Sequence, residues 1–127
     1  MLDHLAIDVS DLARSLAFYE QALAPLGYVL RGLHAQSIAF GNATPAPGDD
    51  PGGSFWICQG TPQPQCVHLA FRAPNRAAVQ AFYLAALAEG GTDNGAPGLR
   101  PHYHAHYYAA FVLDPDGYNV EAVVHTA

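Results

Sequence analysis

The sequence is organised around an internal repeat. Residues 4–27 align with residues 68–91 without a gap and are identical at eleven positions, five of which are alanines. The other six identities are His4/His68, Leu5/Leu69, Phe18/Phe82, Tyr19/Tyr83, Leu23/Leu87 and Gly27/Gly91. A period of 64 in a chain of 127 residues predicts two halves built on the same plan. Because a unit of about 60 residues buries too little surface to be comfortably stable alone, we expect the halves to share one core.

The first half predicts a strand, a helix and three further strands. Residues 2–9 alternate, with Leu5, Ile7 and Val9 on one face and His4 on the other. Ser10 or Asp11 can cap a helix whose apolar stripe ends before a proline and a glycine. Residues 28–33, 35–40 and 54–58 are expected to form strands, and residues 41–53, rich in proline and glycine, to form a loop.

The second half repeats this pattern after a polar linker. A strand is expected from residue 66, with His68 on the same face as His4 in its own strand, followed by a helix from Pro74-Asn75 to Gly90-Gly91. Residues 92–106 are expected to be mostly loop with room for one short strand, and residues 107–113 and 118–125 to be strands around an Asp-Pro-Asp-Gly turn. The prediction is an α+β domain with modules at 1–58 and 66–127 joined by a linker at 59–65.

Composition excludes several classes of function. The net charge is −6 with only five Lys and Arg residues, which argues against nucleic acid and anionic membranes as partners. No apolar run approaches the ~18 residues of a membrane span, and no basic segment precedes an apolar one at the N-terminus. Cys58 and Cys66 are therefore expected to be reduced thiols, and the expected location is cytoplasmic.

A carboxylate in the middle of the last strand is the strongest sign of chemistry. Glu121 lies in Tyr-Asn-Val-Glu-Ala-Val-Val, and buried carboxylates are rare unless they are paired or bound to a metal. If the two sheets curve round a common cleft, Glu121 can meet the repeat-related His4 and His68. Two imidazoles and one carboxylate leave coordination positions open and suit catalytic Fe(II), Mn(II), Zn(II) or Ni(II). The alternative is that these histidines are hydrogen-bonded or partly exposed strand residues. A duplication also preserves residues that serve packing, and Phe18 and Phe82 are expected to be core residues of this kind.

The chain resembles the vicinal oxygen chelate superfamily, which includes glyoxalase I, bleomycin-resistance proteins, fosfomycin-resistance thiol transferases and extradiol dioxygenases. The resemblance covers essentially the whole chain. The residues that carry it are His4-Leu5-Ala6-Ile7, Ser10-Asp11-Leu12, Phe18-Tyr19, His68-Leu69-Ala70-Phe71 and the run from Phe111 to Glu121. It implies paired βαβββ modules whose curved mixed sheet forms a cup around a metal, with helices on the outer face.

One departure from that family bears on activity. Glyoxalase I enzymes have a fourth protein ligand on the last strand of the first module, at the position related to Glu121 by the repeat. Subtracting 64 gives Ile57, and its neighbours Phe55, Trp56 and Cys58 are not carboxylates. We therefore do not expect a typical four-ligand glyoxalase I. A metal-dependent lyase, transferase or dioxygenase remains.

The segment Leu99–Tyr108 contains histidines at every second position together with tyrosines. It could line the mouth of the cup and supply general acid or base groups, with Arg100 holding an anionic substrate. The candidate catalytic residues are Arg100, His102, His104, Tyr107 and Tyr108. The alternatives are a solvated loop whose aromatic side chains pack on the sheet edge, or a dimer contact.

The sequence thus supports two hypotheses. The first is a small metalloenzyme that chelates a small-molecule substrate through adjacent oxygens at a divalent metal held by His4, His68 and Glu121. The second is a metal-free protein that binds a small aromatic or cationic ligand between Trp56, Phe111 and the tyrosines. The resemblance also allows the modules to pair within one chain or across a homodimer.

Overall fold

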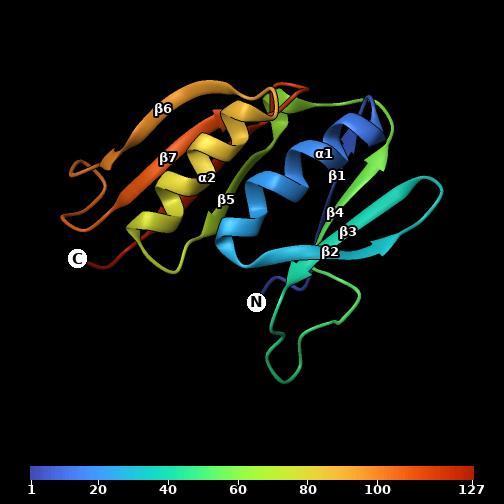
Figure 1. Cartoon of the computed structure of the whole chain (residues 1–127), viewed down its shortest axis with the longest axis horizontal. Helices are drawn as coiled ribbons and strands as arrows, with labels where there is room; N and C mark the ends of the chain where they lie inside the picture. The colour runs from blue at the N-terminus through green and yellow to red at the C-terminus, as the bar shows by residue number, and fades with distance from the viewer.

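The computed structural model describes all residues, 1–127, as two modules of the same plan (Figure 1). The first consists of β1 (Leu5–Val9), α1 (Leu12–Leu23), β2 (Tyr28–Leu33), β3 (Ser37–Asn42) and β4 (Phe55–Gln59). The second consists of β5 (His68–Arg72), α2 (Arg76–Ala88), β6 (Thr92–Leu99), β7 (Tyr108–Leu113) and β8 (Asn119–Val124). Short 3-10 turns at Ala24–Leu26 and Pro64–Cys66 follow α1 and precede β5. The predicted α+β repeat is confirmed.

Each module contains one mixed sheet with the same strand order. The first sheet runs β1-β4-β3-β2 and the second β5-β8-β7-β6. In each, the first strand pairs in parallel with the last, and the remaining pairs are antiparallel. The helix after the first strand supplies the crossover that a parallel pair needs. Since β1 and β5 are edge strands, the residues at their starts lie at the sheet margins.

Polar caps and glycines set the ends of both helices. The Asp11 side chain accepts a hydrogen bond from the backbone N–H of Arg14 at 3.1 Å, and the Asn75 side chain accepts one from Ala78 at 2.8 Å. These contacts satisfy donors that a helix N-terminus otherwise leaves free. The stretch after α1 ends at Gly27 with φ of +83°, and α2 ends before Gly90 with φ of +89°. Both glycines adopt a backbone conformation that disfavours other residues.

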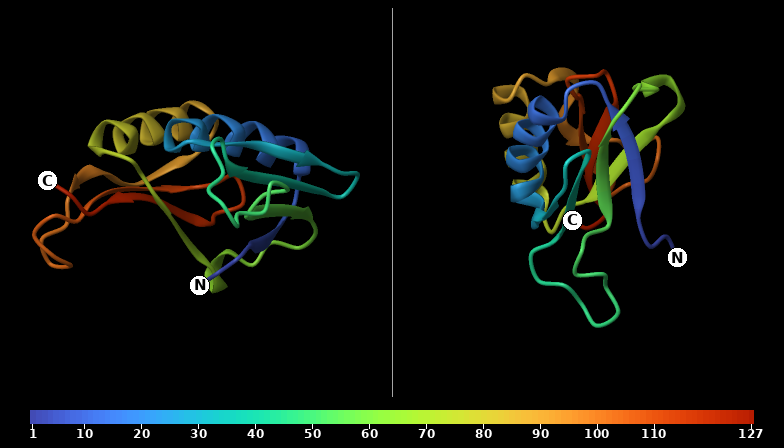
Figure 2. Two further views of the ribbon diagram at one scale, coloured as in Figure 1. Left: turned by 90° about the horizontal axis from the view of Figure 1, so that it is seen from below. Right: turned by 90° about the vertical axis from the view of Figure 1, so that its right-hand side faces the viewer.

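The helices lie side by side over the same side of the two sheets, as Figure 2 shows, and α1 packs against α2. One apolar cluster of 23 buried residues spans both modules and includes Phe18 and Phe82, neither of which is exposed. The expectation of a shared core is therefore confirmed. The Cys58 and Cys66 thiols are both free. Neither helix is long and apolar enough to cross a membrane.

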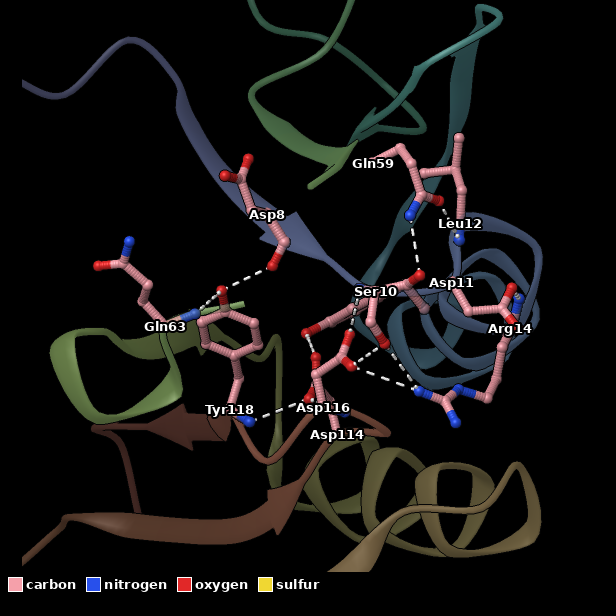
Figure 3. Close-up of polar contacts among 11 residues, drawn as sticks. Asp8, Ser10, Asp11, Leu12, Arg14, Gln59, Gln63, Asp114, Asp116 and Tyr118 are labelled. Carbon is pink, nitrogen blue, oxygen red and sulfur yellow. Dashed lines mark hydrogen bonds and ion pairs between the residues drawn. The ribbon is translucent and has the colours of Figure 1, made fainter. Parts of the chain in front are cut away.

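The Asp-Pro-Asp-Gly turn joins the two modules (Figure 3). Asp116 accepts hydrogen bonds from the backbone N–H and the hydroxyl of Ser10, and Arg14 contacts it at 3.3 Å. Tyr118 donates its hydroxyl to the carbonyl oxygen of Asp8 at 2.6 Å. A turn from the second module is thereby fixed to the β1–α1 connection of the first.

Asp114 is the buried centre of this junction. It accepts hydrogen bonds from the Tyr19 hydroxyl at 2.6 Å and from the backbone N–H groups of Asp116 and Tyr118 at 2.9 Å. Burial raises the pKa of Asp114 above its ordinary value, although these three hydrogen bonds act in the opposite direction. Burial, followed by the nearby Asp114 charge, raises the pKa of Tyr19 well above its ordinary value, so its hydroxyl keeps its proton and donates a hydrogen bond to Asp114.

The strand within residues 92–106 is longer than expected. The sequence predicted mostly loop with one short strand, whereas Thr92–Leu99 forms a strand of eight residues. Its pairing with β7 shifts register between Asp93 and Gly95 and again between Gly95 and Gly98. These irregularities, in an edge strand, accommodate glycines and Pro97, which a regular central strand would not tolerate. Only the remainder, after Leu99, is a loop.

Candidate metal and substrate site

Glu121 is one of two buried carboxylates in the chain, with an exposed fraction of 2%. It lies in the middle of β8, between β5 and β7. Its Oε2 is 2.9 Å from His68 Nε2, and its Oε1 accepts a hydrogen bond from the Tyr107 hydroxyl at 2.5 Å. The compensation that a buried carboxylate requires therefore comes from His68 and Tyr107.

The contacts of His68 resemble those of a metal-binding histidine. Its Nδ1 is 3.1 Å from the carbonyl oxygen of Asn119, which can only accept a hydrogen bond. Nδ1 therefore carries a proton and donates it in a hydrogen bond to the carbonyl oxygen, and Nε2 faces the carboxylate of Glu121. Metal-binding histidines are usually oriented by such a hydrogen bond from the second ring nitrogen.

The spacing of the two groups also fits one metal ion. Two ligands about 2.1 Å from an ion and at right angles to each other are about 3 Å apart. The distance between His68 Nε2 and Glu121 Oε2 is 2.9 Å. Without an ion, these two acceptor atoms must share a proton. The pair therefore fits two neighbouring ligands of a divalent cation.

His4 lies apart from this pair. It precedes β1, its side chain is 61% exposed, and its Nδ1 is 2.6 Å from the Asp3 carboxylate. His4 and His68 both line a cavity of about 730 Å³ at the ends of β1 and β5. No group of three metal-binding side chains comes together within the chain. The structure thus joins His68 to Glu121, whereas His4 meets His68 only as another residue that lines the same cavity.

The structural counterpart of Glu121 in the first module is Trp56, which corrects the expected Ile57. Glu121 pairs with Ala70 on β5, and the repeat partner of Ala70 is Ala6, which pairs with Trp56 on β4. The offset between the last strands is thus 65, because the connection in the second module has one more residue. Because this position is a tryptophan, it offers no carboxylate to a metal. The Trp56 ring stacks on the ring of His34, with centres 5.7 Å apart.

Tyr107 is the residue of the Leu99–Tyr108 segment that reaches the site. Burial, followed by the hydrogen bond to Glu121 and its charge, raises the pKa of Tyr107 to about 12. Tyr107 is therefore a neutral hydrogen-bond donor near pH 7 and a poor general base. Its ring also contacts those of His104 and His125, at 5.4 and 5.1 Å.

The other candidate catalytic residues have different surroundings. His102 is exposed and contacts the Tyr103 ring at 4.2 Å, whereas His104 Nε2 is 3.0 Å from His125 Nδ1. The Tyr108 hydroxyl accepts a hydrogen bond from Gln80 of α2, so Tyr108 faces the helix side of the sheet. Neither His102, His104 nor Tyr108 contacts Glu121 or His68 in these hydrogen bonds and ring contacts.

Arg100 is occupied by its own loop. Its Nη2 donates to the carbonyl oxygen of Ala96 at 2.8 Å, and its Nη1 donates to that of Gly98 at 2.9 Å. Its guanidinium carbon lies 5.4 Å from the centre of the Phe111 ring. Both terminal nitrogens of Arg100 thus already donate to carbonyl oxygens of its own loop.

One contact of the site escaped the sequence reasoning. Asn119 acts through its backbone oxygen, which leaves no mark in a sequence. Phe111 stacks on His68, with ring centres 6.2 Å apart and an angle of 23° between the planes. The sequence placed Phe111 in the pocket of the metal-free alternative, and strand pairing makes it the register partner of Glu121.

Comparison with known proteins places the chain in a family. Residues 32–122 match the model of the Glyoxalase/Bleomycin resistance protein/Dioxygenase superfamily. A glyoxalase/bleomycin resistance protein from Albidiferax ferrireducens T118 is 28% identical, with 95% of each chain covered and a TM-score of 0.77. A glyoxalase-related enzyme from Fulvimarina pelagi is 18% identical, with 97% of this chain and 86% of that chain covered and a TM-score of 0.73.

A third similar structure is a glyoxalase/bleomycin resistance protein/dioxygenase family enzyme from Burkholderia phytofirmans PsJN. It is 18% identical, with 96% of each chain covered and a TM-score of 0.70. A search of curated protein sequences finds no match. The family match spans well over half of the chain, and the solved structures reproduce the two-module fold. The chain belongs to the Glyoxalase/Bleomycin resistance protein/Dioxygenase superfamily.

Proposed function

We propose that the protein is a metal-dependent enzyme that binds a small substrate through two adjacent oxygen atoms at a divalent cation held by His68 and Glu121. The observation that carries the proposal is the 2.9 Å contact between His68 Nε2 and Glu121 Oε2, with His68 Nδ1 held by the carbonyl oxygen of Asn119. The mixed nitrogen and oxygen ligand set suits Fe, Mn, Zn or Ni. It leaves coordination positions for substrate.

The side chains around the proposed site would each have a distinct role. A bound divalent cation supplies Lewis-acid polarisation of a substrate oxygen. His68 and Glu121 would hold the cation, and the Tyr107 hydroxyl would orient Glu121 by donating a hydrogen bond to its Oε1. The cavity of about 730 Å³ is large enough for a small organic molecule. Its wall includes the aromatic side chains of Tyr28, Phe55 and Phe71, which suit an apolar portion of the substrate.

His4 is the proposed third ligand. It lines the cavity with His68 and is largely exposed, so its side chain has freedom to turn. It would act either within the chain or from a second copy in a homodimer. Mixing His4→Ala with His68→Ala protein separates these cases. Recovery of metal binding in the mixture would show sharing between subunits, whereas no recovery would favour a site within one chain.

The test of the proposal is a titration of metal-free, untagged protein with Co²⁺ and Zn²⁺ by calorimetry, with elemental analysis of the purified protein. We expect one ion per chain and displacement by a chelator. A wild-type protein that neither retains nor rebinds a divalent metal would remove the enzyme proposal. In that case, ligand binding that is indifferent to chelator would favour a metal-free binding protein of the bleomycin-resistance type.

Tyr107→Phe is expected to tighten metal binding by about 3- to 10-fold. The Tyr107 hydroxyl donates to Glu121 Oε1 at 2.5 Å, and a hydrogen bond to a charged group is worth about 1.5–3 kcal/mol, part of which metal binding must overcome. The measurement is the Kd for Zn²⁺ at pH 7. Tyr108→Phe is the matched control, because the Tyr108 hydroxyl binds Gln80 on the helix side. A weaker affinity in Tyr107→Phe would instead indicate that Tyr107 supports the bound ion.

A further inference from the structure

The face of the second sheet that carries Glu121 also carries a stack of side chains. Glu121 on β8 pairs with Phe111 on β7, and Phe111 pairs with Gly95 on the edge strand β6. The His68 ring lies along Phe111, with centres 6.2 Å apart and planes 23° from parallel. The Arg100 guanidinium contacts the same ring, at 5.4 Å from its centre.

Two glycines make room for the guanidinium. A Cβ atom at Gly95 would lie 3.0 Å from Phe111 Cδ2 and 3.2 Å from Arg100 Nη2, and one at Gly98 would lie 3.2 Å from Arg100 Nη1. Such spacings are too close for a side chain without movement of the neighbours. The irregular register of β6 at Gly95 and Gly98 thus creates the space in which Arg100 lies.

The guanidinium is fixed within that space. Its two terminal nitrogens donate to the carbonyl oxygens of Ala96 and Gly98, at 2.8 and 2.9 Å. The planar fork of arginine matches this arrangement of acceptors, which a lysine would not reproduce. A guanidinium held in this way is a fixed support for the aromatic ring that it contacts.

His68 needs such a support. Its side chain is 47% exposed, and its backbone position alone does not fix the plane of the imidazole. The ring plane determines whether Nε2 points at Glu121 while Nδ1 remains on Asn119. Stacking on Phe111 restricts this plane, and the orientation of a ligand by its surroundings contributes to metal affinity.

We propose that Arg100 is a positioning residue that acts through Phe111 to hold the His68 imidazole in line with Glu121. This role differs from the contact with a substrate anion that the sequence suggests for Arg100. The effect on metal affinity rests on the proposed function, whereas the orientation of His68 does not. The two parts are therefore measured separately.

The first measurement uses metal-free protein at constant pH. The His68 ring signal, assigned by comparison with His68→Gln, is recorded by carbon-proton NMR together with its proton-proton contacts to Phe111. We expect Arg100→Gln to displace the His68 signal and weaken those contacts, and Phe111→Leu to abolish the ring-current shift. Phe111→Tyr, which keeps the ring, is expected to restore the wild-type signal.

The second measurement is the Kd for Co²⁺ with the visible absorption spectrum of the bound ion. Arg100→Gln and Phe111→Leu are each expected to weaken binding by about 10-fold, as substitutions next to a ligand commonly do, while Phe111→Tyr stays close to wild type. Arg31→Gln is the matched control. Arg31 also donates to a backbone carbonyl, that of Pro51 in the other module, but does not contact the site.

A His68 signal that stays at its wild-type position in Arg100→Gln would overturn the proposal and leave Arg100 as a support of its loop. If the wild type binds no metal, the proposed function fails, and the NMR result still decides the positioning role. If Phe111→Leu does not fold by circular dichroism, Gly95→Ala tests the stack by displacing Phe111. Its control is Gly48→Ala, where φ is also positive but no atom lies within 4 Å.

Discussion

Asp114→Ala is expected to lower the free energy of unfolding by about 3–4 kcal/mol, the largest loss of stability from any substitution considered. The change removes a buried carboxylate that accepts hydrogen bonds from the Tyr19 hydroxyl and from two backbone N–H groups. Each buried donor left without a partner costs about 1–3 kcal/mol. The measurement is urea-induced unfolding followed by circular dichroism.

Two variants separate the hydrogen bonds from general effects of substitution. Tyr19→Phe removes one donor and is expected to cost about 1.5–3 kcal/mol, because the buried carboxylate loses a partner. Asp49→Ala is the exposed control, since Asp49 accepts one backbone hydrogen bond in a surface loop. A loss at Asp114 no larger than that at Asp49 would contradict the assignment of Asp114 as the structural centre of the junction.

The pH dependence of the same site has a definite sign. Burial raises the folded-state pKa of Asp114, so its contribution to stability is fully present below the unfolded pKa of about 3.8 and is lost as pH rises through the folded value. Asp114→Asn does not titrate. We therefore expect this variant to gain stability relative to wild type as pH rises from 3.5 to 7. A relative gain by the wild type over this interval would mean that its hydrogen bonds outweigh burial.

Glu121→Gln is expected to weaken binding of Zn²⁺ or Co²⁺ by more than about 100-fold, because loss of a direct ligand should exceed the 10- to 100-fold cost of losing a neighbouring group. Glutamine preserves the shape of the side chain. Its oxygen can accept from Tyr107 and its amide can donate to His68, so the fold should survive. The measurement is calorimetric titration of metal-free protein.

The matched control for this substitution is Glu89→Gln, an exposed carboxylate at the end of α2. It is expected to bind metal as the wild type does. His68→Gln is expected to behave as Glu121→Gln does, since the two side chains form one pair. Metal affinity that is unchanged in both variants would place any metal elsewhere and remove the proposed ligands.

Much of the fold was predictable because its signals are local. The apolar faces of β1 and β5, the Asp11 and Asn75 helix starts and the glycine stops depend on a few neighbouring residues. The length of strand β6 was underestimated for the same reason. Gly95, Pro97 and Gly98 indicate a loop locally, and only pairing with β7 at an irregular sheet edge makes the segment a strand.

The sequence by itself determined the duplication, the α+β class and the shared core, and it predicted Glu121 and His68 as candidate site residues. These follow from residue identity, periodicity and the cost of burying a carboxylate. The tertiary structure decided which side chains contact one another. It paired Glu121 with His68 and Tyr107, left His4 across a cavity, and made Trp56 the counterpart of Glu121. Such choices depend on strand register and on contacts between residues far apart in the chain, which no local pattern contains.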